Sequence, residues 1–242
     1  MHSWFSEIKR IFILNFIDGD RWKFLVNGLG VTLRITFFAL LIGVAIGIVV
    51  ATVRSTYDKN VETIRHGAGR FLLRFFNAVC KIYLTVIRGT PVVVQLLIFY
   101  FVILISIKNG VLIGIFAFGI NSGAYMAEIF RSGIMSIDAG QFEAGRSLGF
   151  NYIQTMGYII VPQAFKNILP TLANEFIVLL KETAVVGYIG VQDLTKAGDI
   201  IRGRTFSAFM PLIAIALVYL GLVMFFTWLV GKLERRLRSN ER

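Results

Sequence analysis

Uncharged apolar runs alternate with charged segments along the whole chain. No Asp, Glu, Lys or Arg occurs in residues 35–53, 89–107, 109–127 or 205–231. About 20 apolar residues, at about 1.5 Å each in a helix, cross the hydrocarbon core of a bilayer. A fifth stretch, residues 163–187, has a similar length but carries several polar side chains. The pattern therefore predicts an all-α integral membrane protein with five transmembrane helices.

Two local patterns refine this prediction. In the first run, small residues recur every four positions at Ala39, Gly43, Gly47 and Ala51. Such a stripe favours close packing of one helix on another. Before the first run, residues 1–23 mix charges with aromatic side chains, and Ser3 to Phe16 suits a helix lying in the membrane interface. The alternative for this N-terminal segment is a disordered leader.

Composition agrees with a membrane location. Hydrophobic residues make up 56%, charged residues only 16%, and the mean hydropathy is +0.73. These values are unlike those of an ordinary soluble domain. The formal net charge of +11 would suit a nucleic-acid-binding protein, but the basic residues flank apolar runs and form no patch with interleaved aromatics. We therefore expect membrane lipid around the chain and no nucleic-acid partner.

The distribution of Lys and Arg predicts the orientation. We expect residues 54–81 to form a loop, which holds six basic side chains, and residues 233–242 to form a basic tail, so both are assigned to the cytoplasm. Five spans then place the N-terminus outside. The single cysteine, Cys80, lies in the first of these cytoplasmic segments and cannot form an intrachain disulfide.

The sequence offers little catalytic chemistry. It contains no Gly-x-x-x-x-Gly-Lys-[Ser/Thr] phosphate-binding loop, so the chain is not expected to hydrolyse nucleotides. Neither His2 nor His66 has a Cys or carboxylate at ligand spacing, and no nucleophile–base arrangement supports a membrane-embedded enzyme. We expect no enzyme activity, no metal and no cofactor in this chain.

A charged, glycine-marked segment separates two of the predicted spans. Residues 143–148 can form one or two helical turns, with Ala144 and Gly145 leaving a low-profile face that a partner can approach. Gly149 can end that helix in the left-handed conformation, and Pro162 limits where the next helix begins. The alternative interpretation is an ordinary connector between spans.

This segment resembles the EAA loop of the permease subunits of binding-protein-dependent ABC importers. That loop has Glu-Ala-Ala, three residues, Gly, nine residues, Ile, one residue and Leu-Pro. Glu143, Ala144, Gly149, Ile159 and Pro162 fall on this register, whereas Gly145 and Val161 depart from it. The string Arg88-Gly89-Thr90-Pro91 followed by Gln95 is similar to polar amino-acid permeases of the histidine, glutamine and arginine type, as are residues 24–33.

The resemblance implies a multi-pass protein of the bacterial cell membrane that takes up amino acids by alternating access. Residues 24–232 would form the permease domain, with the coupling loop at 138–162. Two cytoplasmic ABC ATPase subunits would supply the ATP and Mg²⁺ chemistry. A second permease subunit, identical or homologous, and an extracytoplasmic amino-acid-binding protein would complete the importer. The ATPase-coupling residues are then Glu143, Ala144, Gly145, Ser147, Leu148, Gly149 and Pro162.

Polar residues within the predicted spans are candidates for the substrate path, because charged and amide groups in a bilayer usually face a cavity. Gly89 and Pro91 would also interrupt a helix there. Glu175 or Glu128 could accept the ammonium of an amino acid and Asn174 could donate to its carboxylate, although Glu175 could instead pair with Arg88. The candidate pathway residues are Arg88, Thr90, Gln95, Tyr125, Glu128, Thr171, Asn174 and Glu175.

A stand-alone ion-coupled secondary transporter or channel is the alternative function. It would account for the charges within the spans but would give the coupling-loop register no purpose. Co-purification distinguishes the two, since only an importer subunit should bring an ATPase with it. The sequence leaves open which amino acid is carried, whether the partner permease is identical, and whether this subunit contacts substrate.

Overall fold

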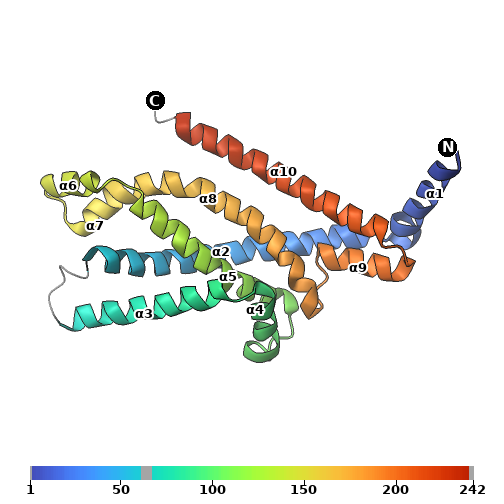
Figure 1. The fold of residues 1–242 in the computed structure, drawn as a ribbon, viewed down its shortest axis with the longest axis horizontal. Coiled ribbons are helices and arrows are strands. Elements are labelled where there is room, and N and C mark those ends of the chain that lie inside the picture. Colours follow the sequence, from blue (N-terminus) through green and yellow to red (C-terminus); the bar gives the residue numbers. More distant parts are fainter. Residues whose placement is uncertain (1, 61–66, 240–242) are drawn as a thin grey trace. The chain divides into compact units, whose positions relative to one another are not determined.

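The computed structural model describes residues 2–60 and 67–239, and the regular elements in those ranges are helical, which confirms the predicted all-α class (Figure 1). The long helices are α2 (Trp22–Asn60), α3 (Ala68–Gly89), α5 (Gly110–Met135), α8 (Val161–Glu182) and α10 (Phe209–Ser239). The shorter α-helices are α1 (His2–Phe12), α4 (Val92–Ile98), α6 (Ala139–Ser147), α7 (Tyr152–Thr155) and α9 (Leu194–Thr205). Brief π-helical or 3₁₀ segments adjoin them at η1 (Ile13–Ile17), η2 (Asp18–Asp20), η3 (Phe99–Ile103), η4 (Met156–Ile160) and η5 (Thr183–Ile189).

Three helices, α2, α5 and α10, are long and apolar enough to cross a membrane. A fourth candidate span consists of α3 together with α4 and η3, which meet at a bend of 110°. The described residues thus contain three candidate spans, or four if the bent pair counts as one. The sequence predicted five. The additional one corresponds to α8, whose apolar pattern is interrupted by side chains such as Lys166, Glu175 and Lys181.

The predicted interruption at Gly89 and Pro91 is present, but it falls at the end of a long helix. Thr90 is extended, with φ −120° and ψ 146°, as expected for a residue before proline. The segment 54–81, which we predicted as a loop, is largely helical, because α2 continues to Asn60 and α3 begins at Ala68. Residues 61–66, including Arg65 and His66, lie outside the described residues.

The chain forms two compact units. The first contains Met1–Phe38, Val92–Phe118 and Ile177–Leu229, and the second contains Ala39–Pro91, Gly119–Phe176 and Val230–Arg242. Four helices, α2, α5, α8 and α10, contribute residues to both units. Each unit is described separately below.

In the second unit, α2 packs closely against α5, as the small-residue stripe predicts. A Cβ on Gly47 would come within 2.5 Å of the Met126 Cβ, and a Cβ on Gly43 would lie 3.0 Å from the Ser122 hydroxyl. The facing glycines of α5 are equally crowded, since a Cβ on Gly119 would meet Ile42 at 2.8 Å. Only glycine on both helices allows the two backbones to approach this closely.

Helix α3 completes the core of the second unit. Cys80 and Leu84 of α3 pack with Val50 of α2 and with Ala124 and Ala127 of α5. Cys80 is a free, buried thiol rather than a residue of an open loop. A label that reacts with exposed cysteines would therefore miss it on either side of a membrane, so Cys80 does not report orientation.

The first unit is organised around the start of α9. Asp193 is fully buried, and its carboxylate accepts from the backbone N–H groups of Thr195 and Lys196 at 3.1 and 3.0 Å. Burial raises the pKa of Asp193, and the hydrogen bonds from the backbone oppose that rise. The Thr32 hydroxyl of α2 accepts from the Leu194 N–H at 3.1 Å. These contacts fix where α9 begins against α2.

The glycine contacts between α2 and α5 generate a prediction about stability. Alanine at position 47 should destabilise the protein by about 1–3 kcal/mol, because its Cβ would overpack the Met126 side chain and the Ala127 backbone. Gly221 of α10 has open space around its Cβ position, so alanine there should be neutral or should stabilise by about 1 kcal/mol through helix propensity. Thermal unfolding in detergent measures both variants. Equal midpoints for Gly47→Ala and Gly221→Ala would contradict the close packing.

Candidate functional site

The segment predicted to couple to an ATPase forms a short helix, α6, whose two ends are defined by specific caps. At its start, the Asp138 carboxylate accepts from the Gly140 N–H at 2.7 Å. At its end, Gly149 has φ +80°, and its N–H donates to the Arg146 carbonyl at 2.9 Å. The N–H of Phe150 donates to the Gly145 carbonyl at 3.1 Å. This pair of bonds is the Schellman motif, so the predicted left-handed cap at Gly149 is confirmed.

Position 145 is one of the two departures from the EAA pattern, and the packing of α6 explains why glycine stands there. It is the buried residue of α6, and a Cβ there would lie 2.6 Å from the Thr155 methyl group of α7. Thr155 is itself 1% exposed, so its side chain fills the space that an alanine methyl would take. Glycine at 145 and threonine at 155 are therefore a matched pair that packs α6 against α7.

Pro162 does not mark the start of the helix that follows the loop. The helical path begins ten residues earlier, where Asn151 and Gln154 form a reciprocal capping box at the start of α7. It then passes through the wide turn η4 before α8 begins at Val161. Proline clashes with the carbonyl four residues before it in a regular α-helix, and a π-helical turn relieves this clash. We expected Pro162 to limit where the next helix begins. Instead, Pro162 lies within a helical path that is already under way.

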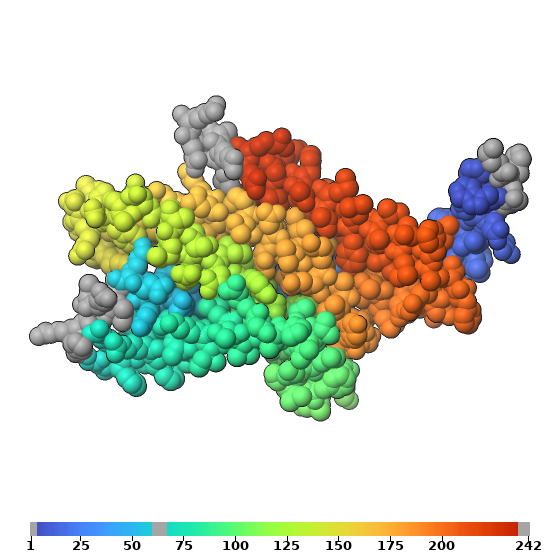
Figure 2. Space-filling model, in the orientation of Figure 1, coloured from blue at the N-terminus to red at the C-terminus, as the bar shows by residue number. Residues whose placement is uncertain are grey.

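The outer side of α6 is open. Glu143, Ala144 and Ser147 are exposed, and Leu148 is 71% exposed. Figure 2 shows the yellow-green atoms of α6 and α7 on the surface of the molecule. A capped helix with a small-residue face and one projecting leucine can dock into a groove on a partner protein.

A cavity of about 580 Å³ lies beside the same loop. It is lined by Lys59, Ala139, Phe142, Glu143, Arg146, Phe150, Asn151, Tyr152 and Thr155. The Lys59 ammonium lies 3.4 Å from the centroid of the Phe142 ring, and Phe142 stacks on Tyr152 with ring centroids 6.5 Å apart. The end of α2 thus contacts α6 through a cation–π interaction. Lys59 and Phe142 were not among the predicted site residues, since nothing in their spacing indicates this contact.

Three of the candidate pathway residues come together in the second unit. Arg88 at the end of α3 lies 3.8 Å from the Glu128 carboxylate and 5.6 Å from the centroid of the Tyr125 ring. Glu128 also accepts from Arg131 at 3.2 Å, and Arg131 lies 3.7 Å from Asp58 of α2. Arg131 and Asp58 were not among the predicted site residues, although Arg131 stands one helical turn after Glu128.

The other pathway candidates are placed separately. Thr171 and Asn174 are exposed on α8, and Glu175 is half-buried and accepts a hydrogen bond from the Ser122 hydroxyl at 3.4 Å. Arg88, which we considered as a partner for Glu175, lies 3.8 Å from the Glu128 carboxylate. The Thr90 hydroxyl donates to the Val86 carbonyl at 2.8 Å.

Gln95 is buried on α4 in the first unit, whereas the other candidates belong to the second.

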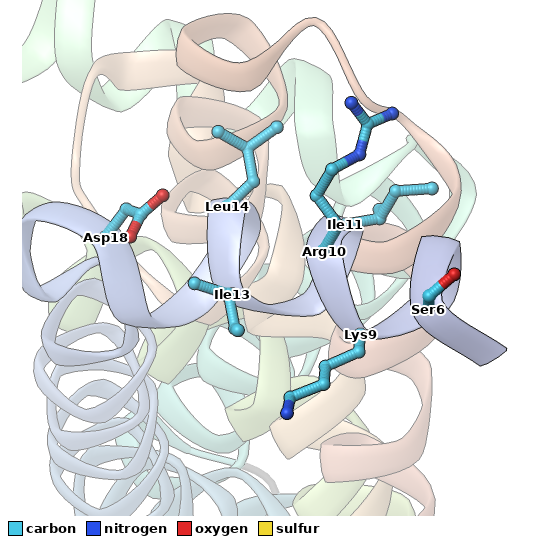
Figure 3. A pocket seen from close by; sticks show the side chains of 7 residues that line it. All are labelled: Ser6, Lys9, Arg10, Ile11, Ile13, Leu14 and Asp18. Atoms are coloured by element: carbon cyan, nitrogen blue, oxygen red, sulfur yellow. The ribbon is translucent and has the colours of Figure 1, made fainter. Parts of the chain in front are cut away.

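A surface hollow of about 530 Å³ lies along the N-terminal helical segment, lined by Ser6, Lys9, Arg10, Ile11, Ile13, Leu14 and Asp18 (Figure 3). All seven side chains come from one stretch of α1, η1 and η2. Trp4, Phe5 and Phe12 of the same segment are exposed. This hollow follows the surface of an amphipathic helix and brings together no further set of catalytic or ligand-binding groups.

The matched pair of Gly145 and Thr155 leads to a second prediction. Gly145→Ala should lower the thermal midpoint, because the new methyl group would overlap the Thr155 side chain, with a cost of about 1–3 kcal/mol. Adding Thr155→Ala should recover part of that loss by opening the space. Thermal unfolding of the wild type, the two single variants and the double variant measures the interaction. Strictly additive effects would show that the two residues do not share this space.

Comparisons with known proteins place the chain in a family. Residues 67–239 match the family described as binding-protein-dependent transport system inner membrane component. The chain is 36% identical over 221 residues to the arginine transport system permease protein ArtQ of Bacillus subtilis, covering 90% of this chain and 94% of the relative. It is also 36% identical over 166 residues to the glutamine transport system permease protein GlnP of Escherichia coli, covering 67% and 76%.

Two solved structures share the fold. One, described as an amino acid ABC transporter with histidines, is 41% identical with a TM-score of 0.77, over 88% of this chain and 94% of that one. The other, from the inward-facing MetNI methionine ABC transporter, has a TM-score of 0.75 at 19% identity, over 90% and 98%. Its identity is low enough that it supports the fold alone. The family match and the relatives show that the chain belongs to the family of binding-protein-dependent transport system inner membrane components.

Proposed function

We propose that this chain is the permease subunit of an ATP-driven amino-acid importer and that it passes substrate by alternating access. The observation that carries the proposal is α6, a doubly capped helix with an open face on the EAA register. Relatives named for glutamine and arginine transport, and a structural neighbour named for amino acids, support the substrate class. The family's dependence on a binding protein implies a partner that delivers substrate.

The coupling loop would connect this chain to two cytoplasmic ATPase subunits, which hold the ATP and Mg²⁺. Glu143, Ala144, Ser147 and Leu148 would form the contact, while Gly145, Gly149 and Pro162 would shape the loop. Closure of the ATPase dimer would draw the docked helices of two permease subunits together. A rigid, capped helix transmits such a displacement without absorbing it, which suits hinge or rigid-body switching between outward-facing and inward-facing states.

We infer an inner-membrane topology of five spans, with α8 as the span that composition alone does not support. The N-terminus would lie outside, with residues 1–23 at the interface, residues 24–232 as the permease domain, and residues 233–242 as a cytoplasmic tail. The exposed aromatic side chains of α1 and the excess of Lys and Arg in residues 54–81 and 232–242 support this arrangement.

The polar face of α8 supports a role in the pathway. Thr171 and Asn174 are exposed in the single chain, and polar groups at membrane depth usually face a bundle interior or a water-filled cavity. A second permease subunit, identical or homologous, would enclose that face. Asn174 would donate to a substrate carboxylate, and Glu175 would accept from its ammonium. Glu128, already paired with two arginines, would lie beside the path with Arg88 and Tyr125.

Position 149 provides a sharp test of the coupling role, because a matched glycine exists elsewhere. Gly149 and Gly190 have φ +80° and +78°, and both have open space at their Cβ positions. Valine at either should cost at least about 1 kcal/mol of stability through backbone strain. Only Gly149→Val should also reduce co-purification of the ATPase or the amount of amino acid moved per ATP. Glu143→Lys should also reduce ATPase co-purification or the amount of amino acid moved per ATP, but without loss of stability.

Purified complexes in proteoliposomes report both quantities. If Gly149→Val and Glu143→Lys retain the ATPase and transport with wild-type coupling, α6 is an ordinary connector.

A separate test concerns substrate contact. Asn174→Ala and Glu175→Gln should lower uptake about tenfold or more, since a hydrogen bond to a charged group contributes about 1.5–3 kcal/mol. Asn167→Ala, two turns earlier on α8, removes a hydrogen bond to Ser136 instead and should leave substrate affinity unchanged. Uptake of radiolabelled amino acids at several concentrations separates affinity from maximal rate. Unchanged affinity and selectivity in both test variants would place the substrate path elsewhere.

A further inference from the structure

A continuous series of charged contacts joins α6 to the break between α3 and α4. At one end, Lys59 contacts the Phe142 ring of α6. Its neighbour Asp58 pairs with Arg131 at 3.7 Å, and Arg131 pairs with Glu128 at 3.2 Å. These groups all belong to the second unit.

The series ends where the helix breaks. Glu128 lies 3.8 Å from Arg88, which is followed by the Gly89-Thr90-Pro91 interruption. The two carboxylate oxygens of Glu128 are divided, with Oε1 facing Arg88 and Oε2 accepting from Arg131. The Glu128 carboxylate therefore links the C-terminal end of α3 to the C-terminal half of α5.

The adjacent positions of Asp58 and Lys59 explain how one helix end contacts two elements. Successive side chains on an α-helix point about 100° apart, given 3.6 residues per turn. Asp58 therefore faces α5 while Lys59 faces α6. A displacement of α6 would therefore act on Lys59, and the residue before it, Asp58, contacts Arg131.

Partial burial makes the pairs of Arg131 with Asp58 and with Glu128 stronger than ordinary surface ion pairs, whereas Arg88 is 46% exposed and its pair with Glu128 is more open to screening. The side chains of Asp58, Glu128 and Arg131 are 30%, 28% and 31% exposed. Ion pairs removed from water are screened less, and loss of one partner leaves the other charge uncompensated. Such pairs have discrete made and broken arrangements, which is what a switching element requires.

We propose that a relay of five side chains positions the α3–α4 break according to the displacement of α6. The relay consists of Lys59, Asp58, Arg131, Glu128 and Arg88. The relay rests on the importer function proposed above. Its members are positioning residues, since they act on the path through one another. In this arrangement Arg131 cannot move with Asp58 without carrying or releasing Glu128, and thereby Arg88.

The two end members test the series character of the relay. Asp58→Asn, Arg88→Gln and the double variant should be assembled with the ATPase and the binding protein in proteoliposomes. The measured quantity is amino acid taken up per ATP hydrolysed at saturating substrate, a ratio that does not depend on how much complex assembles. Each single variant should lower this ratio about fivefold or more, the usual size of coupling between linked sites.

The double variant should be no worse than the more affected single variant, because a series broken once is already interrupted. Lys23→Gln, which removes the ion pair with Asp20 outside the relay, should leave the ratio unchanged. Effects of Asp58→Asn and Arg88→Gln that multiply would show two independent structural roles and would overturn the relay. A wild-type ratio in either single variant would overturn it as well.

Lys59 offers a conservative comparison. Lys59→Arg retains a cation over the Phe142 ring and should keep the wild-type ratio, whereas Lys59→Met should lower it as Asp58→Asn does. Equal ratios for Lys59→Arg and Lys59→Met would remove Lys59 from the relay. A wild-type complex that takes up no amino acid would instead contradict the proposed function, so the two failures are distinguishable.

Discussion

The close approach of α2 and α5 determines where the charged groups of the second unit can meet. Gly47 and Gly119 leave no room for a side chain at the contact, so the two helices lie at backbone distance along several turns. This separation lets Asp58, near the end of α2, reach Arg131, near the end of α5. A wider spacing would hold the helices together through side chains alone and would separate these charges.

Helix α6 depends on its caps rather than on close packing between long helices. α6 is too short to be stable by its own propensity, since isolated helices below about 12–15 residues are marginal in water. Its ends are instead fixed by hydrogen bonds, from the Asp138 carboxylate at the start to the Gly149 Schellman motif at the end. Its single buried position, Gly145, then sets its distance from α7. A few local residues thus define α6, and its exposed side chains are not needed to stabilise it.

Sequence predicted best those features that depend on one residue type or one period. Gly149 was identifiable because left-handed backbone strongly favours glycine, and the stripe through Gly43 and Gly47 because its four-residue spacing follows the helix. Long-range pairing was not predictable in the same way. Glu128 and Arg88 are 40 positions apart. Nothing in the neighbouring sequence shows that Arg88, rather than Lys81, pairs with a carboxylate on α5.

The helix boundaries predicted from the sequence were wrong for a related reason. Charged residues from Arg54 to Lys81 indicated a loop, yet the described ones lie on α2 and α3, and Arg54 donates to Asn77 at 3.0 Å. Pro162 indicated a helix start, yet the widened turn of η4 accommodates it inside a longer helical path.

One departure from the EAA pattern follows from local packing. Glycine stands at 145, where the pattern has alanine, and the Thr155 side chain of α7 fills the space that an alanine methyl would take. Glu143, Ala144 and Leu148 are exposed and do not take part in this contact with Thr155. The two helices that meet at this contact are capped independently. The Schellman motif at Gly149 ends α6 and the capping box at Asn151 begins α7, so local hydrogen bonds define both sides of the contact within three residues.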